Sequence, residues 1–276
     1  MTSSFWIRFL GNPRVLLGLI WLALVVIGAL AAPLIAPLDP FAISGKPFVR
    51  PMDGFLFGTD SLGRSVWSGL VHGARTTLLI AIIATLAAVA FGGLLGALSG
   101  FYGGRTDNLL MRITEFFQTI PSFIFAILLV AVLSPSATSV VVAIATVSWP
   151  PIARIVRAEV MSLRSREFIQ AAVTLGERDF VILFRQILPN ALSPLIVTGS
   201  LLVATAILTE SALSFLGLGA PNFMSWGFMI GAGRSFLRDA WWLVAIPGIA
   251  ILLTVLSINL VGEGLNDALN PRLRTP

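Results

Sequence analysis

The sequence has no cysteine, one lysine and one histidine, and each of these absences excludes a class of function. Without cysteine, the chain cannot form disulfides or thiolate metal sites. The single lysine, Lys46, lies between Gly45 and Pro47, so no nucleotide-binding loop of the form GxxxxGK followed by Ser or Thr is present. With His72 as its one histidine, the chain also cannot carry the HExxH zinc motif. We therefore predict no catalytic residues, no metal site and no cofactor in this chain.

Charged residues are scarce as well, at 11% of the chain, whereas soluble domains carry about 25%. Hydrophobic residues make up 57%, and they gather into six blocks near 15–37, 78–100, 117–133, 137–155, 194–217 and 242–262. Each block is close to the roughly 20 residues that cross a bilayer as a helix. The alternation of apolar and polar residues expected of a membrane β-barrel is missing. The sequence therefore predicts an all-α polytopic membrane protein with about six transmembrane helices.

The distribution of positive charge predicts the orientation of these helices. With the N-terminus inside, 12 of the 18 Lys and Arg residues fall on the inner side, as the positive-inside rule requires. This count places both termini in the cytoplasm. The net charge of +5 includes no basic run, which argues against nucleic acid as a partner.

Two segments between the blocks are too long to be simple connectors. The outer one, about 38–76, opens with three prolines that end the first helix: Pro33, Pro37 and Pro40. The inner one, about 158–191, carries many charges, and burying each of them deep in the membrane would cost about 3 kcal/mol. We expect the 158–191 segment to stay in water.

The 158–191 segment contains two sets of apolar residues at helical spacing. The first set is Phe168, Ala171, Ala172 and Leu175; the second is Phe180, Leu183, Phe184 and Ile187. Gly176 is expected to end the first helix and Pro189 to close the second. The apolar faces could pack on the protein's own helices or dock in the groove of a partner. A pair of such helices hinged at a glycine favours docking.

Several motifs resemble those of a known family. Gln170-Ala171-Ala172, Gly176 and Ile187-Leu188-Pro189 are similar to the EAA loop of binding-protein-dependent ABC importer permeases. Other segments resemble the dipeptide, oligopeptide and nickel branch of that family: Phe57-Gly58-Thr59-Asp60-Ser61-Leu62-Gly63-Arg64, Gly73-Ala74-Arg75, Glu210 to Gly219, Trp226-Gly227, and the tail Asn270-Pro271-Arg272-Leu273-Arg274. The chain departs from the pattern at Gln170, where a glutamate is expected, so that Glu167 is the nearest carboxylate.

The resemblance implies a single transmembrane permease domain over 1–276 with the type I ABC importer fold, in the bacterial inner membrane. Such a subunit is not an enzyme: ATP and Mg are bound by two separate cytoplasmic ATPase subunits. The other implied partners are a second permease, usually a different chain, and an extracytoplasmic solute-binding protein. Di- or oligopeptides are the expected substrates, although nickel chelates share this scaffold. The residues implied to couple to the ATPase are Glu167, Gln170, Ala171, Ala172, Gly176, Phe180, Phe184, Leu188 and Pro189.

Glu210 is an acidic residue inside the fifth apolar block. A carboxyl group at this depth must face protein or a water-filled cavity. Three interpretations stay open: a structural hydrogen bond to a neighbouring helix, a group lining the translocation path, and a proton-coupling carboxylate. Ser214 and Trp226 are likewise candidates for the path or for structure. The third interpretation defines an alternative function, a proton-coupled secondary transporter that uses Glu210.

Overall fold

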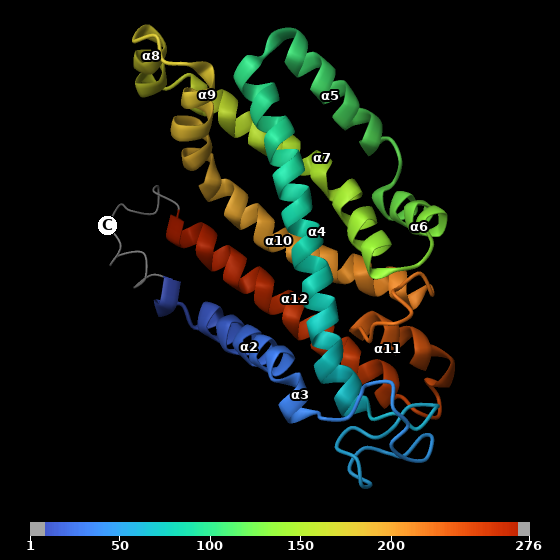
Figure 1. Cartoon of the computed structure of the whole chain (residues 1–276). Helices are drawn as coiled ribbons and strands as arrows, with labels where there is room; N and C mark the ends of the chain where they lie inside the picture. Colours follow the sequence, from blue (N-terminus) through green and yellow to red (C-terminus); the bar gives the residue numbers. More distant parts are fainter. Residues whose placement is uncertain (1–8, 270–276) are drawn as a thin grey trace.

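The computed structural model describes residues 9–269, and in this part of the chain the regular structure is helical, with two isolated β-bridges and no strand (Figure 1). The motif at 270–274 and both predicted cytoplasmic termini lie outside the described residues. The helices are α2 (Pro13–Leu30), α3 (Ala32–Ile35), α4 (Val66–Tyr102), α5 (Gly104–Gln118), α6 (Ser122–Leu133), α7 (Ala137–Arg164), α8 (Glu167–Thr174), α9 (Asp179–Val181), a π-helical stretch (Ile182–Ile187), α10 (Leu188–Phe215), α11 (Trp226–Gly233), a 3-10 turn (Arg234–Phe236) and α12 (Trp242–Leu269).

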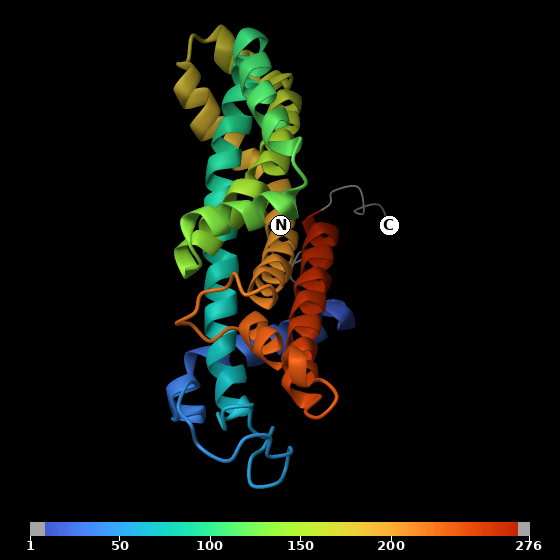
Figure 2. The same ribbon diagram turned by 90° about the vertical axis from the view of Figure 1, so that its right-hand side faces the viewer.

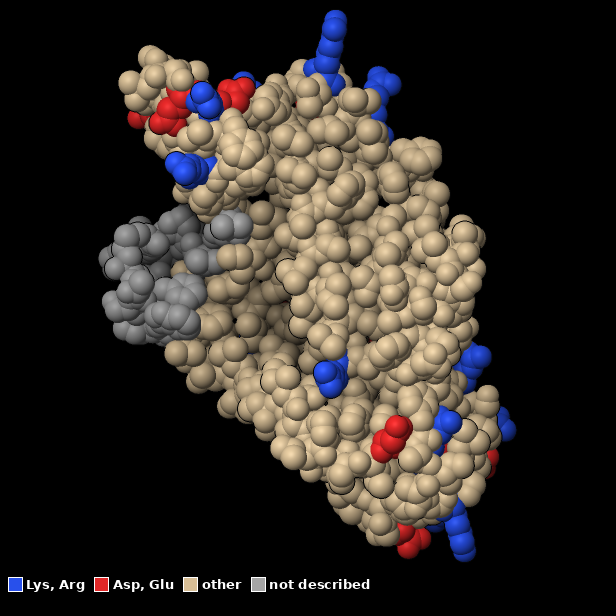
Figure 3. Space-filling view, in the orientation of Figure 1, with Lys and Arg blue, Asp and Glu red and all other residues tan. Residues whose placement is uncertain are grey.

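Five of the described helices are long and apolar enough to cross a membrane: α2, α4, α7, α10 and α12. A sixth candidate is the pair α5 and α6, which meet at an angle of 82°. The prediction of about six spans in an all-α membrane protein is therefore confirmed. At the end that carries α8 and at the opposite end, charged side chains gather, while the middle of the visible face is almost free of them (Figure 3).

The expectation of a straight third span over 117–133 is wrong. Apart from residues 117 and 118, which end α5, the only helix in this range is α6. Its 12 residues reach about 18 Å, well short of the roughly 30 Å of hydrocarbon. The break falls just before Pro121, which has no N–H and disfavours helix at the residue before it. The other half of the pair, α5, escaped notice because it is amphipathic, with Asp107 in its first turn.

The second span also starts earlier than the expected residue 78. Helix α4 begins at Val66, where the Ser65 side chain caps it by accepting a hydrogen bond from the Ser68 N–H, and it runs for 37 residues. At about 55 Å it is longer than the membrane is thick. The predicted 38–76 segment therefore ends as a loop at residue 65, and its last part is helix.

Among the described helices, α4 and α7 share the most extensive contact, side by side in Figures 1 and 2. Three glycines one turn apart on α4, namely Gly92, Gly96 and Gly100, face the backbone carbonyls of Trp149, Ala153 and Arg157 on α7. A Cβ atom at any of the three would lie within 3.0 Å of the facing carbonyl oxygen. Small residues at this spacing let membrane helices approach at backbone distance.

The loop before α4 is held together by hydrogen bonds within the loop. The Thr59 hydroxyl donates to the Lys46 carbonyl at 2.6 Å and accepts from the Val49 N–H at 2.9 Å. The indole of Trp242 donates to the Thr59 carbonyl, which ties the loop to the start of α12. Gly58 has a φ of +76°, a conformation that favours glycine. The loop is therefore an ordered element, and it lies at the opposite end of the molecule from α8 (Figure 1).

Candidate functional site

The predicted docking element at 158–191 forms a helical projection at one end of the molecule (Figure 1). Helix α8 ends at Thr174, and Gly176, two residues later, has a φ of +75°. The Glu177 N–H donates to the Ala172 carbonyl at 3.1 Å, and the Gly176 N–H donates to the Val173 carbonyl at 3.0 Å. These two bonds are those of a Schellman helix end, which places glycine in the left-handed conformation. The turn at Gly176 sends the chain back toward the membrane helices.

The apolar residues expected on one face of α8 are divided between the protein core and the exposed surface. Ala172 is buried, and together with Ile169 it joins the protein's own core cluster. Phe168 and Leu175 point outward, and Leu175 is 82% exposed. The expectation that four residues share one face turned toward a partner is therefore wrong for Ala172. The reason is that α8 has a second apolar edge, through Ile169, and this edge packs inward.

The second apolar set is divided in the same way. Leu183 and Ile187 are buried, whereas Phe180 is 67% exposed and its ring lies 4.4 Å from that of Phe184. We call the exposed set Phe168, Leu175, Phe180 and Phe184 the apolar patch. Within it, the two aromatic rings lie in contact with each other and are partly exposed, and contiguous exposed apolar surface often marks an interaction site.

The expectation that Pro189 closes the second helix is wrong, because the chain continues from α9 through the π-helical stretch into α10. The Leu188 N–H bonds to the Leu183 carbonyl, five residues back. Pro189 then follows directly after this π-helical stretch, at the start of α10. Leu188 is partly buried and Pro189 is exposed, so this pair sits at the base of the projection.

The remaining predicted coupling residues are exposed polar or small side chains. Glu167 lies in the first turn of α8, and Ala171 faces solvent. The Gln170 amide donates to the Arg164 carbonyl at the end of α7, at 3.0 Å. A glutamate could not donate this bond, so the departure from the family pattern ties α8 to α7.

Glu210 is buried at the other end of α10, with 1% of its surface exposed. Its Oε1 atom accepts hydrogen bonds from the hydroxyls of Ser214 and Ser225, both at 2.8 Å. Ser225 also caps α11 by accepting from the Phe228 N–H at 3.1 Å. The carboxyl group therefore joins α10 to the start of α11, which is the geometry of the structural interpretation.

Trp226 extends this connection to α4. Its backbone N–H donates to the Thr77 hydroxyl at 3.1 Å, and its indole N–H donates to the Leu70 carbonyl at 2.8 Å. The next residue, Gly227, packs closely on α10, because a Cβ atom at this position would lie only 2.6 Å from the Cα of Ser211. Ser214 and Trp226, named from the sequence, are thus brought together with Glu210. Ser225 and Thr77 were missed, although a hydroxyl at the edge of an apolar block, such as that of Thr77, is a usable signal.

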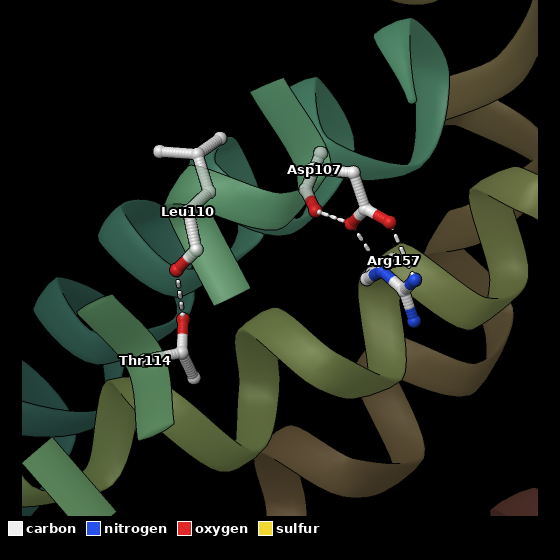
Figure 4. A network of polar contacts seen from close by, with 5 residues as sticks. Asp107, Leu110, Thr114 and Arg157 are labelled. Atoms are coloured by element: carbon white, nitrogen blue, oxygen red, sulfur yellow. Dashed lines mark hydrogen bonds and ion pairs between the residues drawn. The ribbon is translucent and has the colours of Figure 1, made fainter. Parts of the chain in front are cut away.

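A second polar network, also missed from the sequence, joins α5 to α7 (Figure 4). Arg157 binds Asp107 through two hydrogen bonds of 2.5 and 2.6 Å, and the Ser99 hydroxyl on α4 donates to the same carboxylate. Paired N–H groups of arginine match the two oxygens of a carboxylate. Nothing in the local sequence pairs these residues, which stand 50 positions apart.

Comparison with known proteins places these features in one family. Residues 92–275 match the family described as "binding-protein-dependent transport system inner membrane component", and residues 1–48 match the "N-terminal TM domain of oligopeptide transport permease C". The chain is 41% identical, over 99% of its length and 92% of the relative, to the di/tripeptide transport system permease protein DppC of Pseudomonas aeruginosa. It is 38% identical to the oligopeptide transport system permease protein OppC of Bacillus subtilis, over 97% of this chain and 88% of the relative.

Among solved structures, the chain resembles one of the MetNI methionine ABC transporter in an inward-facing conformation. The TM-score is 0.62 at 19% identity, over 74% of this chain and 97% of the other. This likeness confirms the type I importer fold predicted from the motifs. The alternative of a proton-coupled transporter finds no support among the relatives. The chain therefore belongs to the family of binding-protein-dependent ABC importer permeases, in the branch that contains the dipeptide and oligopeptide permeases.

Proposed function

We propose that this chain is one of the two permease subunits of an ATP-driven importer of di- or oligopeptides in a bacterial inner membrane. The observation that carries the proposal is the 41% identity over 99% of the chain to a di/tripeptide permease. The oligopeptide permease resemblance supports peptides over nickel chelates or other small solutes. Under this proposal the whole of 1–276 acts as one permease domain.

The apolar patch is the proposed contact with a cytoplasmic ATPase subunit. Helix α8 and the chain that follows it expose Leu175 and Phe180 in an otherwise charged, water-exposed projection. An amphipathic helix that lays such residues into a groove is a common recognition mode. Two ATPase subunits would bind ATP and Mg, because this chain has no P-loop. Because these ATPase subunits are cytoplasmic in this proposal, the apolar patch would face the cytoplasm.

A second permease subunit, encoded as a different chain, is the proposed partner within the membrane. The break between α5 and α6 leaves backbone groups near residues 119–121 outside a regular helix. Such groups need cover from protein or a water-filled path when they lie at membrane depth. The solute path would then run between the two permeases, with the solute-binding protein delivering peptide at the end formed by the 38–65 loop and residues 216–241.

Transport is proposed to follow from movement of the coupling projection. Closure of the ATPase pair would displace α8 and the continuous helix that follows it. Because ATP changes the relative free energy of the outward- and inward-facing states, it shifts their populations without any chemistry on the peptide.

The test is uptake of radiolabelled trialanine by proteoliposomes that contain the complete transporter. We expect uptake only with ATP and the solute-binding protein, and no change when a protonophore removes the proton gradient. Uptake by this chain alone, or uptake that collapses with the proton gradient and survives without ATP, would contradict the proposal.

Substitution of Glu210 distinguishes the structural from the proton-coupling interpretation. Glu210→Gln keeps an oxygen that can accept from Ser214 and Ser225, so we expect uptake close to that of the wild type. Glu210→Leu leaves both hydroxyls without this acceptor, at about 1–3 kcal/mol each, and is expected to lower the melting temperature. Differential scanning fluorimetry and uptake are measured on the same preparations. A Glu210→Gln variant that is as stable as the wild type but inactive would show that a titrating carboxyl group is required.

A further inference from the structure

We propose that the cavity at the end of the molecule opposite α8 is a receiving site for the termini of the transported peptide, with Arg75 as its carboxylate-binding group. The inference rests on the proposed function and assigns a place where this chain itself contacts the peptide. The cavity has a volume of about 750 Å³, within the range of small-molecule sites. Its walls come from the loop before α4, from α4, from the start of α7 and from the loop between α10 and α11.

Arg75 is the cationic side chain of the cavity. It is exposed on α4, and within the described residues its guanidinium has no hydrogen-bond or ion-pair partner. The other potential cation, His72, is already engaged, since its Nε2 lies 3.0 Å from the Ala36 carbonyl. An unpaired guanidinium in a concave site has two parallel N–H donors for a carboxylate.

The N-terminus of α7 reinforces this preference for an anion. Ala137 and Thr138, the first two residues of this 28-residue helix, line the same cavity as Arg75. The first N–H groups of a helix lack partners within the helix, and the helix dipole adds positive potential there. Ser136 caps only the N–H of Ser139. A peptide carboxylate in the cavity would therefore meet two independent sources of positive potential.

Asp39 supplies the complementary charge. One of its oxygens accepts a hydrogen bond from the Phe41 N–H at 2.7 Å, while the residue stays exposed at the rim of the cavity. An ammonium group and a carboxylate are the two features that all unmodified peptides share. A site with one available arginine and one carboxylate matches a zwitterion of this kind better than it matches a metal chelate or a neutral solute.

The rest of the wall is apolar and makes few demands on the peptide side chains. Leu79, Ile80 and Ile83 of α4 face Val141 of α7 and Phe223 of the 216–225 loop. Apolar walls bind by area and not by direction. Recognition of the two charged ends with tolerance of the side chains between them is what an importer of mixed peptides requires.

The experiment compares trialanine with its C-terminal amide in the complete transporter. Initial uptake is measured for the wild type, Arg75→Gln and Arg75→Lys, with one preparation of solute-binding protein. Each variant is compared with the wild type on the same peptide. Any preference of the solute-binding protein for one of the two peptides therefore affects variant and wild type equally and does not change their ratio. We expect Arg75→Gln to reduce uptake of trialanine roughly tenfold or more and to leave uptake of the amide unchanged. Arg75→Lys should restore part of the loss.

The matched control is Arg112→Gln on α5, which removes another exposed arginine that does not line this cavity and should leave the uptake of both peptides unchanged. Equal loss of both peptides in Arg75→Gln would mean that Arg75 contacts a protein partner and would overturn the proposal. Unchanged trialanine uptake would overturn it as well. A wild-type transporter that takes up neither peptide would contradict the proposed function itself, an outcome separate from any effect of Arg75.

Discussion

Replacing Gly96 with alanine is expected to lower the melting temperature of the purified protein by about 5 °C or more and to reduce the amount recovered from membranes. The added methyl group would overlap the Ala153 carbonyl oxygen and lie 3.0 Å from the Ala153 Cα. Both obstacles are backbone atoms of α7, so no side chain can turn away to make room. The two central helices would have to separate.

Gly93 provides a matched control on the same helix. A Cβ atom at Gly93 would meet nothing within 4 Å, and alanine favours helix over glycine by up to about 1 kcal/mol. Gly93→Ala should therefore be as stable as the wild type or more so. Fluorescence-detected melting of both variants in one detergent checks the pair. If both variants melted alike, the glycine row on α4 would not be what sets the distance between the helices.

Replacing Leu175 with aspartate is expected to abolish ATP-coupled uptake while the chain still inserts and folds. Leu175 is 82% exposed, so its substitution removes no internal contact. At a central position of an interface, such a change costs about 2–4 kcal/mol, which weakens association on the order of 100-fold. The measurement is recovery of the ATPase subunits with the tagged permease, together with uptake.

Two further variants separate docking from folding at the same helix. Leu175→Met keeps an apolar side chain of similar size and should retain both ATPase binding and uptake. Ala172→Asp is expected to act differently, because Ala172 is buried against Ile169 and its neighbours: it should destabilise the projection as well as uncouple it. Normal ATPase recovery and normal uptake with Leu175→Asp would refute the docking role of the apolar patch.

The spans could be predicted from the sequence because burial in lipid requires long apolar runs, and such runs are visible without a structure. Their limits depended on local details. Ser65 starts α4 ahead of its apolar part, and Pro121 divides the third span into two pieces. Amphipathic α5 has too many polar residues to stand out from composition. The apolar signal is averaged over about twenty residues, so it does not show features that depend on one or two residues.

The individual residues of the candidate site could be predicted from the sequence, but the residues that they contact could not. Helical spacing indicated the apolar residues of the 158–191 segment, but it could not tell Ala172, which packs inward, from Leu175, which does not. The depth of Glu210 in an apolar block indicated a partner, whereas the identity of that partner, Ser225, depends on how α11 folds back on α10. Arg157 and Asp107 meet only because α5 and α7 cross. Tertiary contacts of this kind leave no local pattern.

The uninterrupted path from α9 through the π-helical stretch into α10 has a mechanical consequence. Phe180 and Glu210 stand 30 residues apart on this helical path, about 45 Å along its axis, and Pro189 and Pro194 lie between them. Under the proposed coupling, a push on the aromatic pair would pass along the helical backbone toward the serine-bound carboxyl group, and the two prolines mark where the helix can bend.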